Sequence, residues 1–284
     1  MVLWGSYPAM AKLALRDFPP VFLTTLRCVV ASVFLVGLTL RSGEATTRGL
    51  TQAALRTFVV LGIAGLCLSM QLTYLALYYT TAGNVVILSA ATPVTVALAA
   101  RFYLGERLRQ VQWVGVAASA FGVILIITNG RLAALRIEDL RVGDFINLVS
   151  ISGWTAYTVY GKRVLGTFSP VLATTGAYVV GTLLLIPTAA VTAPFFPAPR
   201  LSSAIGWLVV LYQALAGAIA HVWWYRAVEV VGPSRAAIFM NLQPFIGIAL
   251  AAALLAEPIT RWQLVGGVFV LGGVALTTRR QPPT

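Results

Sequence analysis

The residues most able to do chemistry in this sequence are one histidine and several aromatic residues that lie inside long apolar segments. His221 is the only histidine and stands in "GAIAHVWWYRA", one turn before Tyr225. An imidazole can exchange a proton near neutral pH, so proton coupling is one interpretation. We favour a neutral ring that is hydrogen-bonded to a neighbouring helix or a ligand, because proton coupling normally needs a relay partner.

Other aromatic residues recur at helical spacing. Tyr74 and Tyr78 lie one turn apart, and Gln71 shares their helix face. A three-residue spacing also puts two further pairs each on one face, Trp4 with Tyr7 and Trp154 with Tyr157. For these pairs a cavity wall and simple packing remain equally open, since a buried Tyr or Trp needs a polar partner in either case.

Three polar residues, Ser89, Asn241 and Gln243, also lie inside apolar segments. Hydrogen bonding between helices and contact with a ligand are both open for them. Sites of this kind are mostly apolar, with a few polar groups that orient the ligand. The candidate substrate-binding set is Trp4, Tyr7, Gln71, Tyr74, Tyr78, Ser89, Trp154, Tyr157, His221, Tyr225, Asn241 and Gln243.

Several chemistries are not indicated. The two cysteines, Cys28 and Cys67, have no metal-binding spacing, and we expect no metal and no cofactor. The sequence has no HExxH, no GxSxG and no pair of aspartates inside an apolar segment, which argues against an enzyme. None of the eight acidic residues stands at the centre of an apolar segment. Since ion-driven carriers commonly place a carboxylate there, this favours facilitated export down a gradient or a pump that uses another group.

The composition points to lipid as the solvent. Of the 284 residues, 59% are hydrophobic and 10% charged, and the mean hydropathy is +0.87, whereas soluble proteins have roughly 25% charged residues. The net charge of +12 comes from basic residues that fall mainly between apolar runs, which is typical of helix orientation in a bilayer and not of nucleic-acid binding. The expected partners are therefore the bilayer and a small solute, with no nucleic acid, and the chain is expected to be a monomer or a weak dimer.

Ten apolar segments are long enough, or nearly so, to cross a membrane as helices. The predicted fold is accordingly an all-α integral membrane protein with ten transmembrane helices. Residues 1–15 show no cleavable signal peptide, and the short first segment leads us to expect a few more N-terminal residues in the full-length protein. The segments are residues 2–16, 20–40, 57–79, 83–103, 110–128, 144–164, 170–193, 204–227, 234–255 and 262–278.

The two halves of the chain repeat each other. A shift of 150 positions places Trp4 on Trp154 and Lys12 on Lys162, and a shift of 151 places Tyr74 on Tyr225. We expect repeat 1 at 1–129, an inter-repeat loop at 130–143 and repeat 2 at 144–284. Because each repeat holds five spans, an odd number, the second enters from the opposite side, which gives two inverted five-helix repeats.

The charge distribution predicts an orientation. Of the 20 Lys and Arg residues, twelve fall on the side that holds both termini and seven on the other, while Arg27 lies inside the second segment. The expected location is a bacterial inner (plasma) membrane, and the positive-inside rule then places both termini on its cytoplasmic side.

A proline and a glutamate recur in both halves with the same separation, in "TPVTVALAARFYLGE" (92–106) and again at Pro244 and Glu257. Thirteen residues of helix span about 20 Å, so a glutamate just outside the hydrocarbon core puts the proline near mid-membrane. Each proline frees a backbone carbonyl that needs another partner. We predict that Pro93 and Pro244 are paired hinges and that the glutamates are interfacial.

Glycine recurs at close helical spacing in two late segments, "GVAASAFGV" (115–123) and "GGVFVLGGVAL" (266–276). Small residues let helices approach closely, which indicates tight packing within each repeat or at a dimer face.

The block "AGNVVILSAATPVTVALAARFYLGERLRQVQWVGVAASAFGVIL" has the order N, P, LGE, Q, G, G. The block "SRAAIFMNLQPFIGIALAAALLAEPITRWQLVGGVFVLGGVAL" repeats it with Arg235 in place of Asn84 and with LAE in place of LGE. This order resembles the EamA-type repeat of the drug/metabolite transporter superfamily, over nearly the whole chain. The chain is most similar there to bacterial amino-acid and aromatic-metabolite exporters of the YddG type. The resemblance implies a ten-helix exporter with a central cavity lined by helices 1, 3, 4, 6, 8 and 9.

The predicted function is export of small metabolites, foremost aromatic and neutral amino acids, by alternating access through an aromatic-lined cavity and by facilitated diffusion. The alternative is a proton-coupled drug or other metabolite efflux carrier of the same superfamily. A multidrug-cation pump is less favoured, since "MVLWGSYPAMAKLAL" contains no glutamate. A carrier of phosphorylated sugars ranks low, because Lys12, Lys162 and Arg163 lie towards helix ends and not in a central cavity.

Overall fold

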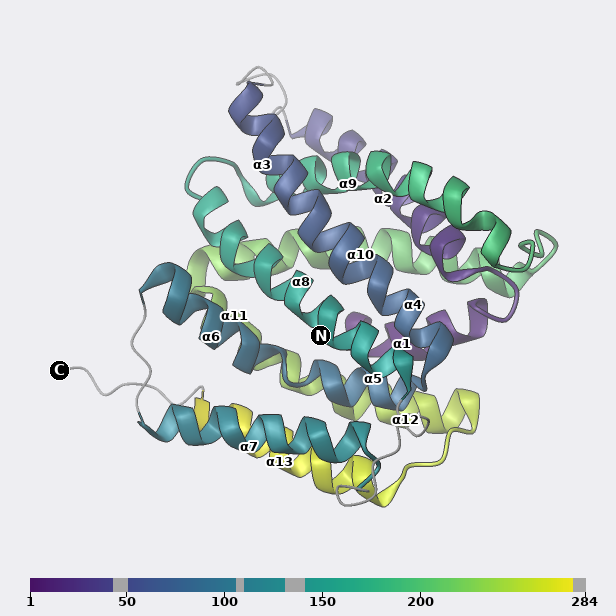
Figure 1. Ribbon diagram of the computed structural model, residues 1–284. Helices are drawn as coiled ribbons and strands as arrows, with labels where there is room; N and C mark the ends of the chain where they lie inside the picture. The colour runs from purple at the N-terminus through teal and green to yellow at the C-terminus, as the bar shows by residue number, and fades with distance from the viewer. Residues whose placement is uncertain (43–50, 106–109, 131–140, 278–284) are drawn as a thin grey trace.

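The computed structural model describes residues 1–42, 51–105, 110–130 and 141–277 (Figure 1). Within these ranges all regular structure is helical and no strand occurs. Most of the predicted inter-repeat loop 130–143 lies outside the described residues, as does Glu106. In chain order the elements are α1 Val2–Ala14, α2 Pro20–Arg41, α3 Gln52–Gly62, the π-helix η2 Ile63–Gln71, α4 Leu72–Tyr79, α5 Ala82–Ser89, α6 Thr92–Leu104, α7 Gln110–Ile127, α8 Val142–Val164, α9 Pro170–Thr192, the 3-10 helix η4 Ala193–Phe195, α10 Ala204–Val231, α11 Pro233–Ile238, the 3-10 helix η5 Phe239–Leu242, α12 Gln243–Leu255 and α13 Arg261–Thr277.

Every predicted apolar segment falls on helical structure, and only short links separate α4 from α5 and α10 from α11. Helix starts follow local signals. Thr81 caps α5 by accepting from the Asn84 N–H (3.1 Å), and Ser169 caps α9 in the same way. Pro20 and Pro170 occupy first-turn positions, where a missing N–H is harmless.

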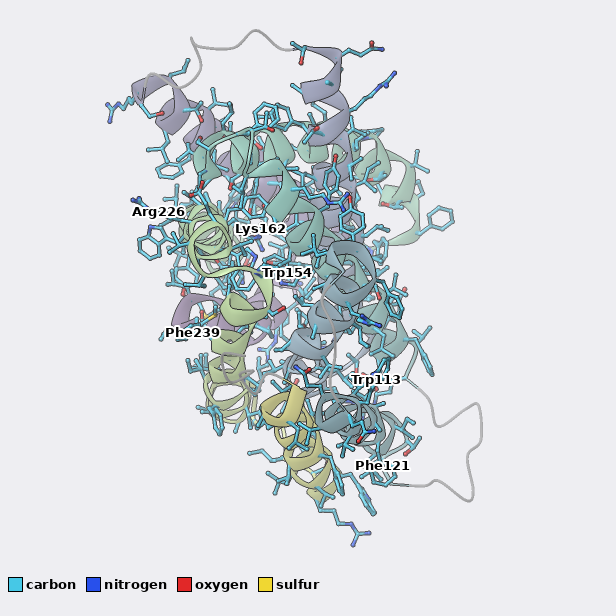
Figure 2. All side chains as sticks on the ribbon, turned by 90° about the vertical axis from the view of Figure 1, so that its left-hand side faces the viewer. Trp113, Phe121, Trp154, Lys162, Arg226 and Phe239 are labelled. Carbon is cyan, nitrogen blue, oxygen red and sulfur yellow. The ribbon has the colours of Figure 1, made fainter. Side chains whose placement is uncertain are left out.

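Among the described residues, five helical stretches are long and apolar enough to cross a membrane: Pro20–Arg41, Gln52–Tyr79, Ala82–Leu104, Pro170–Phe195 and Ala204–Val231. Large apolar side chains cover much of the outside, among them Trp113, Phe121 and Phe239, which are 47%, 41% and 61% exposed. Figure 2 shows these three at the periphery, whereas Trp154 lies in the interior. Contiguous apolar surface on this scale suits lipid and not water.

The segment predicted at 57–79 is not a uniform α-helix. Its middle, Ile63–Gln71, winds as a π-helix between α3 and α4. Close backbone approaches accompany this change: a Cβ on Gly65 would come within 2.5 Å of the Tyr157 ring, and one on Gly153 within 2.8 Å of the Ser69 nitrogen. The sequence prediction missed the π-helix because it accompanies these tertiary contacts, which the sequence does not show. Such π-helical turns are frequent near functional sites.

Helical breaks do precede both predicted hinge prolines. Helix α5 ends at Ser89 and α6 begins at Thr92, with Pro93 in its first turn. In the second half η5 separates α11 from α12, which contains Pro244. The Ser89 carbonyl, which Pro93 cannot bond, accepts from the Thr92 hydroxyl (2.5 Å).

Glu257 bonds the start of a helix from the other half of the chain. Its two carboxylate oxygens accept from the backbone N–H groups of Ala82 and Gly83, both at 3.0 Å. These are the first residues of α5, where orphan N–H groups and the helix dipole favour an anion.

The glycines of α7 and α13 pack against each other. A Cβ on Gly273 would lie 2.4 Å from the Gly115 carbonyl oxygen, and one on Gly122 would lie 2.5 Å from the Gly266 oxygen. The two helices run side by side at one edge of the molecule, away from α2 and α9 (Figure 1). The glycine segments therefore join the two halves within one chain, so the expected packing within each repeat is wrong, while a dimer face stays a prediction.

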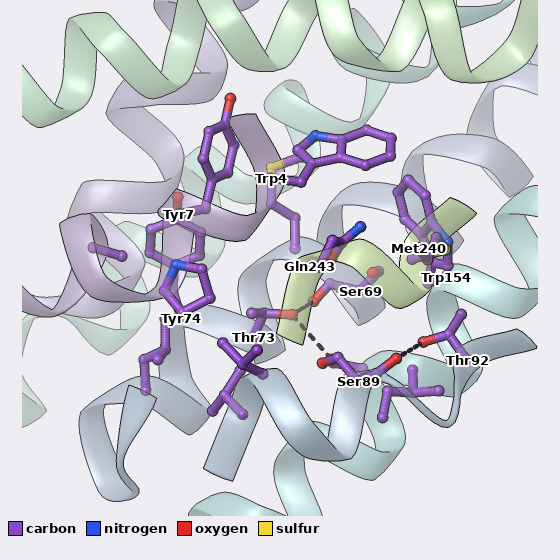
Figure 3. Close-up of a pocket in the computed structure, with 18 of the residues that line it drawn as sticks. Trp4, Tyr7, Ser69, Thr73, Tyr74, Ser89, Thr92, Trp154, Met240 and Gln243 are labelled. Atoms are coloured by element: carbon purple, nitrogen blue, oxygen red, sulfur yellow. Dashed lines mark hydrogen bonds between the residues drawn. The ribbon is translucent and has the colours of Figure 1, made fainter. Parts of the chain in front are cut away.

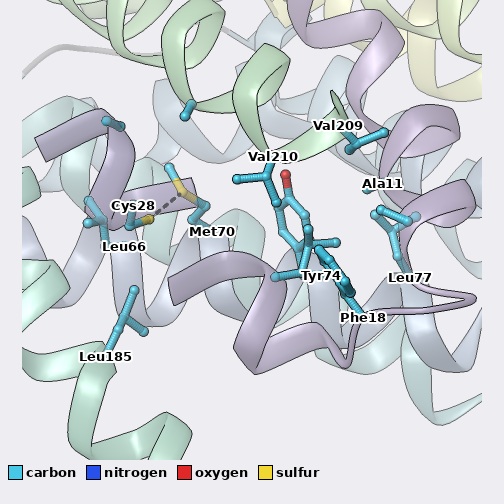
Figure 4. Close-up of a cluster of buried hydrophobic side chains, with 14 of the residues drawn as sticks. Ala11, Phe18, Cys28, Leu66, Met70, Tyr74, Leu77, Leu185, Val209 and Val210 are labelled. Carbon is cyan, nitrogen blue, oxygen red and sulfur yellow. Dashed lines mark hydrogen bonds between the residues drawn. The ribbon is translucent and has the colours of Figure 1, made fainter. Parts of the chain in front are cut away.

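The largest buried apolar cluster joins helices of both halves (Figure 4). Tyr74 and Leu77 of α4 lie in it together with Val210 of α10, and Cys28 of α2 packs against Met70 with their sulfurs 3.5 Å apart. Cys28 thus lies in the cluster and Cys67 packs against it, so both cysteines have packing roles. The cluster supports one side of the cavity described next.

Candidate functional site

A cavity of about 140 Å³ lies between the halves (Figure 3). Its lining comes from α1, α2, η2, α4, α5 and α6 of the first half and from α8, α10, η5 and α12 of the second. Seven of the twelve predicted substrate-binding residues line it: Trp4, Tyr7, Tyr74, Ser89, Trp154, His221 and Gln243.

One wall of the cavity is aromatic. The Trp4 and Trp154 rings meet edge to face with centroids 5.3 Å apart, and His221 lies 5.2 Å from Trp4 and 5.5 Å from Trp154. Trp224 closes the cluster from behind at 5.7 Å from Trp4. Edge-to-face geometry matches the positive ring edge to the negative ring face, so the cluster is a rigid apolar surface.

The Trp154 indole N–H is buried and has no hydrogen-bond partner. Because a buried indole N–H usually finds an acceptor, this donor is available to a ligand in the cavity.

Hydroxyl groups form a second wall, which the sequence prediction captured only through Ser89. Thr73 Oγ1 donates to the Ser69 carbonyl (2.9 Å) and lies 2.9 Å from Ser150 Oγ (Figure 3). Thr92 joins them beside Ser89. The signal was available, since Ser150 precedes Trp154 by one helical turn and Ser69 precedes Thr73 by one turn.

Arg27 also lines the cavity, although the sequence analysis assigned it no role. The side chain is 1% exposed. Its Nη1 donates to the Tyr74 hydroxyl, and its Cζ lies 5.3 Å from the Tyr7 ring centroid and 5.2 Å from that of Tyr74. An arginine between two aromatic faces is stabilised by cation–π attraction.

His221 is hydrogen-bonded to its own helix and to a neighbouring helix. The favoured interpretation of the sequence included a hydrogen bond to a neighbouring helix or a ligand. Its Nδ1 lies 2.8 Å from the Gly217 carbonyl of its own helix and 3.1 Å from the Tyr178 hydroxyl of α9. A carbonyl oxygen can only accept, so Nδ1 carries the proton and donates to Gly217. These two contacts hold the ring in place, and neither of them is to a carboxylate.

The remaining predicted residues lie elsewhere. Tyr157 and Tyr225 stack on each other with centroids 4.7 Å apart, behind the tryptophan cluster. Gln71 is buried outside the cavity lining, and neither of its amide atoms has a partner. Tyr78 is 37% exposed and contacts Phe196. The Asn241 side chain lies outside the described part of the structure.

Lys12 and Lys162 hold helix ends by the same kind of contact. Lys12 Nζ donates to the carbonyls of Leu77 (2.5 Å) and Thr80 (2.6 Å) at the end of α4. Lys162 Nζ donates to the carbonyls of Val228 (3.3 Å) and Glu229 (2.9 Å) near the end of α10. Lysine is favoured at such positions because it satisfies orphan carbonyls and the helix dipole.

A buried polar network surrounds Asp144 at the start of α8. Its carboxylate is 1% exposed and accepts from Thr80 Oγ1 (2.6 Å) and from Asn84 Nδ2 (3.1 Å). The side-chain amide oxygen of Asn84, Oδ1, in turn accepts from Gln263 Nε2 (2.7 Å). The carboxylate is thus held by neutral donors, and it joins the start of α8 to α5 and α13.

No group of three or more His, Cys, Asp or Glu residues that could hold a metal ion occurs within the described ranges.

Comparison with known proteins assigns the family. The model of the EamA-like transporter family matches residues 1–128 and 141–279. An uncharacterized transporter of Archaeoglobus fulgidus is 29% identical over 99% of this chain and 95% of its own length. The uncharacterized transporter YdeK of Bacillus subtilis is 31% identical over 93% and 88%, and the uncharacterized inner membrane transporter YedA of Escherichia coli K12 is 24% identical over 97% and 87%.

A solved crystal structure that is 19% identical superposes with a TM-score of 0.69 over 96% of this chain and 92% of the other, and at that identity it supports the fold alone. Together with the apolar helices, the family match leads to one identification: the chain belongs to the EamA-like transporter family and is a multi-pass membrane transporter.

Proposed function

We propose that the protein exports small metabolites, foremost aromatic and other neutral amino acids, across the bacterial inner membrane. The observation that carries the proposal is the cavity between the two halves, which has an aromatic wall and a hydroxyl wall and, among its described lining residues, one charged side chain. Such a surface suits a small solute with an apolar or aromatic body. The inner-membrane location is supported by the name of the Escherichia coli relative and by the excess of basic residues on one side.

We further propose ten membrane spans arranged as two inverted repeats, 1–129 and 144–284, with both termini in the cytoplasm. Matched contacts support this proposal. Trp4 and Trp154, related by 150 positions, meet at the cavity. Lys12 and Lys162, related by the same shift, bond the carbonyls of Leu77 and Val228.

Transport in this scheme is alternating access, in which one half moves against the other around a fixed central site. Pro93 and Pro244 are the proposed hinges. Support comes from the helical breaks beside them and from cavity residues close to each break, namely Ser89 in one half and Gln243 in the other. Because proline cannot donate to the preceding turn, each break bends without losing a hydrogen bond.

Facilitated diffusion is the proposed energetics. The cavity lining includes no aspartate or glutamate among the described residues, and His221 is occupied by Gly217 and Tyr178. A proton-coupled efflux carrier is the second candidate, since a histidine does line the cavity.

The direct test is flux of radiolabelled phenylalanine and leucine into proteoliposomes that contain the purified protein, with protein-free liposomes as the control. Saturable flux above the control is expected in the absence of a pH gradient. Absence of flux for every neutral and aromatic amino acid tried would overturn the proposed substrate class. Accumulation against a gradient, driven only by an imposed pH difference, would favour the proton-coupled carrier.

A further inference from the structure

Arg27 is a buried cation without a counter-charge. Four acidic residues lie in the described part of the chain: Asp17, Asp144, Glu229 and Glu257. None of the four lies within ion-pair distance of Arg27, and Asp17 pairs instead with Arg200 at 3.0 Å. An ionised side chain inside a membrane protein is costly unless another charge or several polar groups compensate it.

The partners that Arg27 does have are neutral. Tyr74, which accepts from Nη1, donates its own proton to Gln213 Oε1, and Gln213 Nε2 donates to the Tyr7 carbonyl (3.0 Å). This chain of hydrogen bonds fixes the position of the guanidinium but cancels none of its charge. Arg27 Nε is buried and has no partner at all.

A glycine, Gly217, lies next to the guanidinium of Arg27. A Cβ on Gly217 would come within 2.9 Å of Arg27 Nη2, so the absence of a side chain at Gly217 makes room for the guanidinium. The arginine is therefore a built feature of the site, held between α2, α4 and α10, and it borders the cavity.

The cavity also contains a second donor without an acceptor, the Trp154 indole N–H. Two residues of the lining thus have donors that the described residues leave unpartnered, and the described lining has no acidic residue, so a ligand could supply the acceptor. A carboxylate fits, because it offers two acceptor oxygens and the planar guanidinium binds it by two parallel hydrogen bonds. Arg27 is the only Lys or Arg in the described lining, which matches a monoanion better than a phosphate dianion.

We propose that Arg27 binds the carboxylate of the transported solute and that an α-amino group is dispensable for binding. The proposal rests on the exporter function and names the group by which that same cavity recognises its ligand. The described lining provides no acid for an ammonium group, which could rest only against the aromatic faces of Trp4, Tyr7 or Trp154. The substrate class is then small monocarboxylates with an apolar or aromatic body, amino acids among them.

Calorimetric titration of the detergent-purified full chain tests this with three probes of one skeleton: phenylalanine, 3-phenylpropionate and phenethylamine. The first two carry the carboxylate, and the third carries only the amine. We expect both carboxylates to bind and phenethylamine to bind at least tenfold more weakly. Equal binding of phenethylamine, or no binding of either carboxylate, overturns the proposal.

Variants of the arginine sharpen the result. Arg27→Gln is expected to weaken binding of both carboxylates at least tenfold. Arg27→Lys is expected to weaken it less, because lysine keeps the positive charge but lacks the planar guanidinium that forms two parallel hydrogen bonds. Arg226→Gln on the exposed face of α10 is the matched control and is expected to bind like the wild type. Wild-type affinity in Arg27→Gln overturns the proposal. If Arg27→Gln does not fold, Arg27→Lys and the probe series on the wild-type protein decide.

The outcome is separable from that of the exporter proposal. Binding of carboxylates without any flux in proteoliposomes keeps the Arg27 site and rejects the exporter. Flux of phenethylamine but not of 3-phenylpropionate keeps a transporter and rejects the Arg27 site.

Discussion

Trp4 and Trp154 meet edge to face at 5.3 Å although 150 positions separate them in the chain. Trp4 lies near the start of α1 and Trp154 near the middle of α8. Their contact forms part of the cavity wall. The two residues that the predicted repeat aligns are thus in contact at the proposed binding site.

Trp154→Ala is expected to raise the solute concentration for half-maximal flux about tenfold. An aromatic pair contributes roughly 0.5–1.5 kcal/mol beyond its buried area, and each 1.4 kcal/mol is tenfold in affinity. The measurement is initial flux against solute concentration in proteoliposomes. Trp113→Ala, at a 47% exposed position on α7, is the control and should leave the curve unchanged. Equal curves for the two variants would remove Trp154 from the site.

His221→Asn should leave transport independent of an imposed pH gradient. The assigned hydrogen bond runs from Nδ1 to the Gly217 carbonyl, and the asparagine amide occupies a similar position and can donate there. Flux is measured with and without the gradient for the variant and the wild type, and the ratio of the two rates is expected to be near one for both. A wild-type ratio well above one that falls to one in His221→Asn would establish His221 as a coupling residue.

Pro93→Ala and Pro244→Ala are each expected to lower the maximal flux several-fold while affinity changes little. Alanine restores an N–H that can bond the preceding turn, so the helical break closes and bending becomes harder. Both maximal flux and solute affinity must be measured, because a hinge affects the first and a binding residue the second. Pro258→Ala, in the exposed link before α13, serves as the control. Unchanged maximal flux in both variants contradicts the hinge assignment.

Gly273→Ala is expected to destabilise the protein, whereas Gly272→Ala is not. A Cβ at Gly273 would lie 2.4 Å from the Gly115 carbonyl oxygen, while a Cβ at Gly272 meets nothing within 4 Å. Overpacking of a tight interface costs about 1–3 kcal/mol, and alanine for glycine in a free helical position gains roughly 0.5–1 kcal/mol. The thermal midpoint in detergent should therefore fall for Gly273→Ala and hold or rise for Gly272→Ala. The reverse order would mean that α7 and α13 do not pack in this register.

Much of the architecture could be predicted because membrane solvation acts on local sequence. Apolar runs of sufficient length must be helical in lipid, and the predicted segments fall on helices with short links where glycine and proline punctuate them. The breaks before Pro93 and Pro244 are equally local, since a missing N–H disrupts the preceding turn in any surroundings. The π-helix at Ile63–Gln71 was not predictable in this way, because it accompanies close contacts with α8 and α9.

The candidate site was likewise predictable only in part. Residue type and spacing were enough to select Trp4, Trp154 and His221 as cavity candidates. They could not separate these from Tyr157 and Tyr225, which have the same spacing but stack on each other behind the wall.

Arg27 shows most clearly what the sequence alone determined and what only the tertiary structure decided. The sequence determined that one arginine stands inside an apolar helix, where lipid would not tolerate it. Only the folded chain decides whether that charge meets an acid, water or a ligand, because its neighbours Tyr74 and Gly217 come from helices far away in sequence. Charge is a property of the residue, whereas compensation of charge depends on what the fold brings within a few ångströms of it.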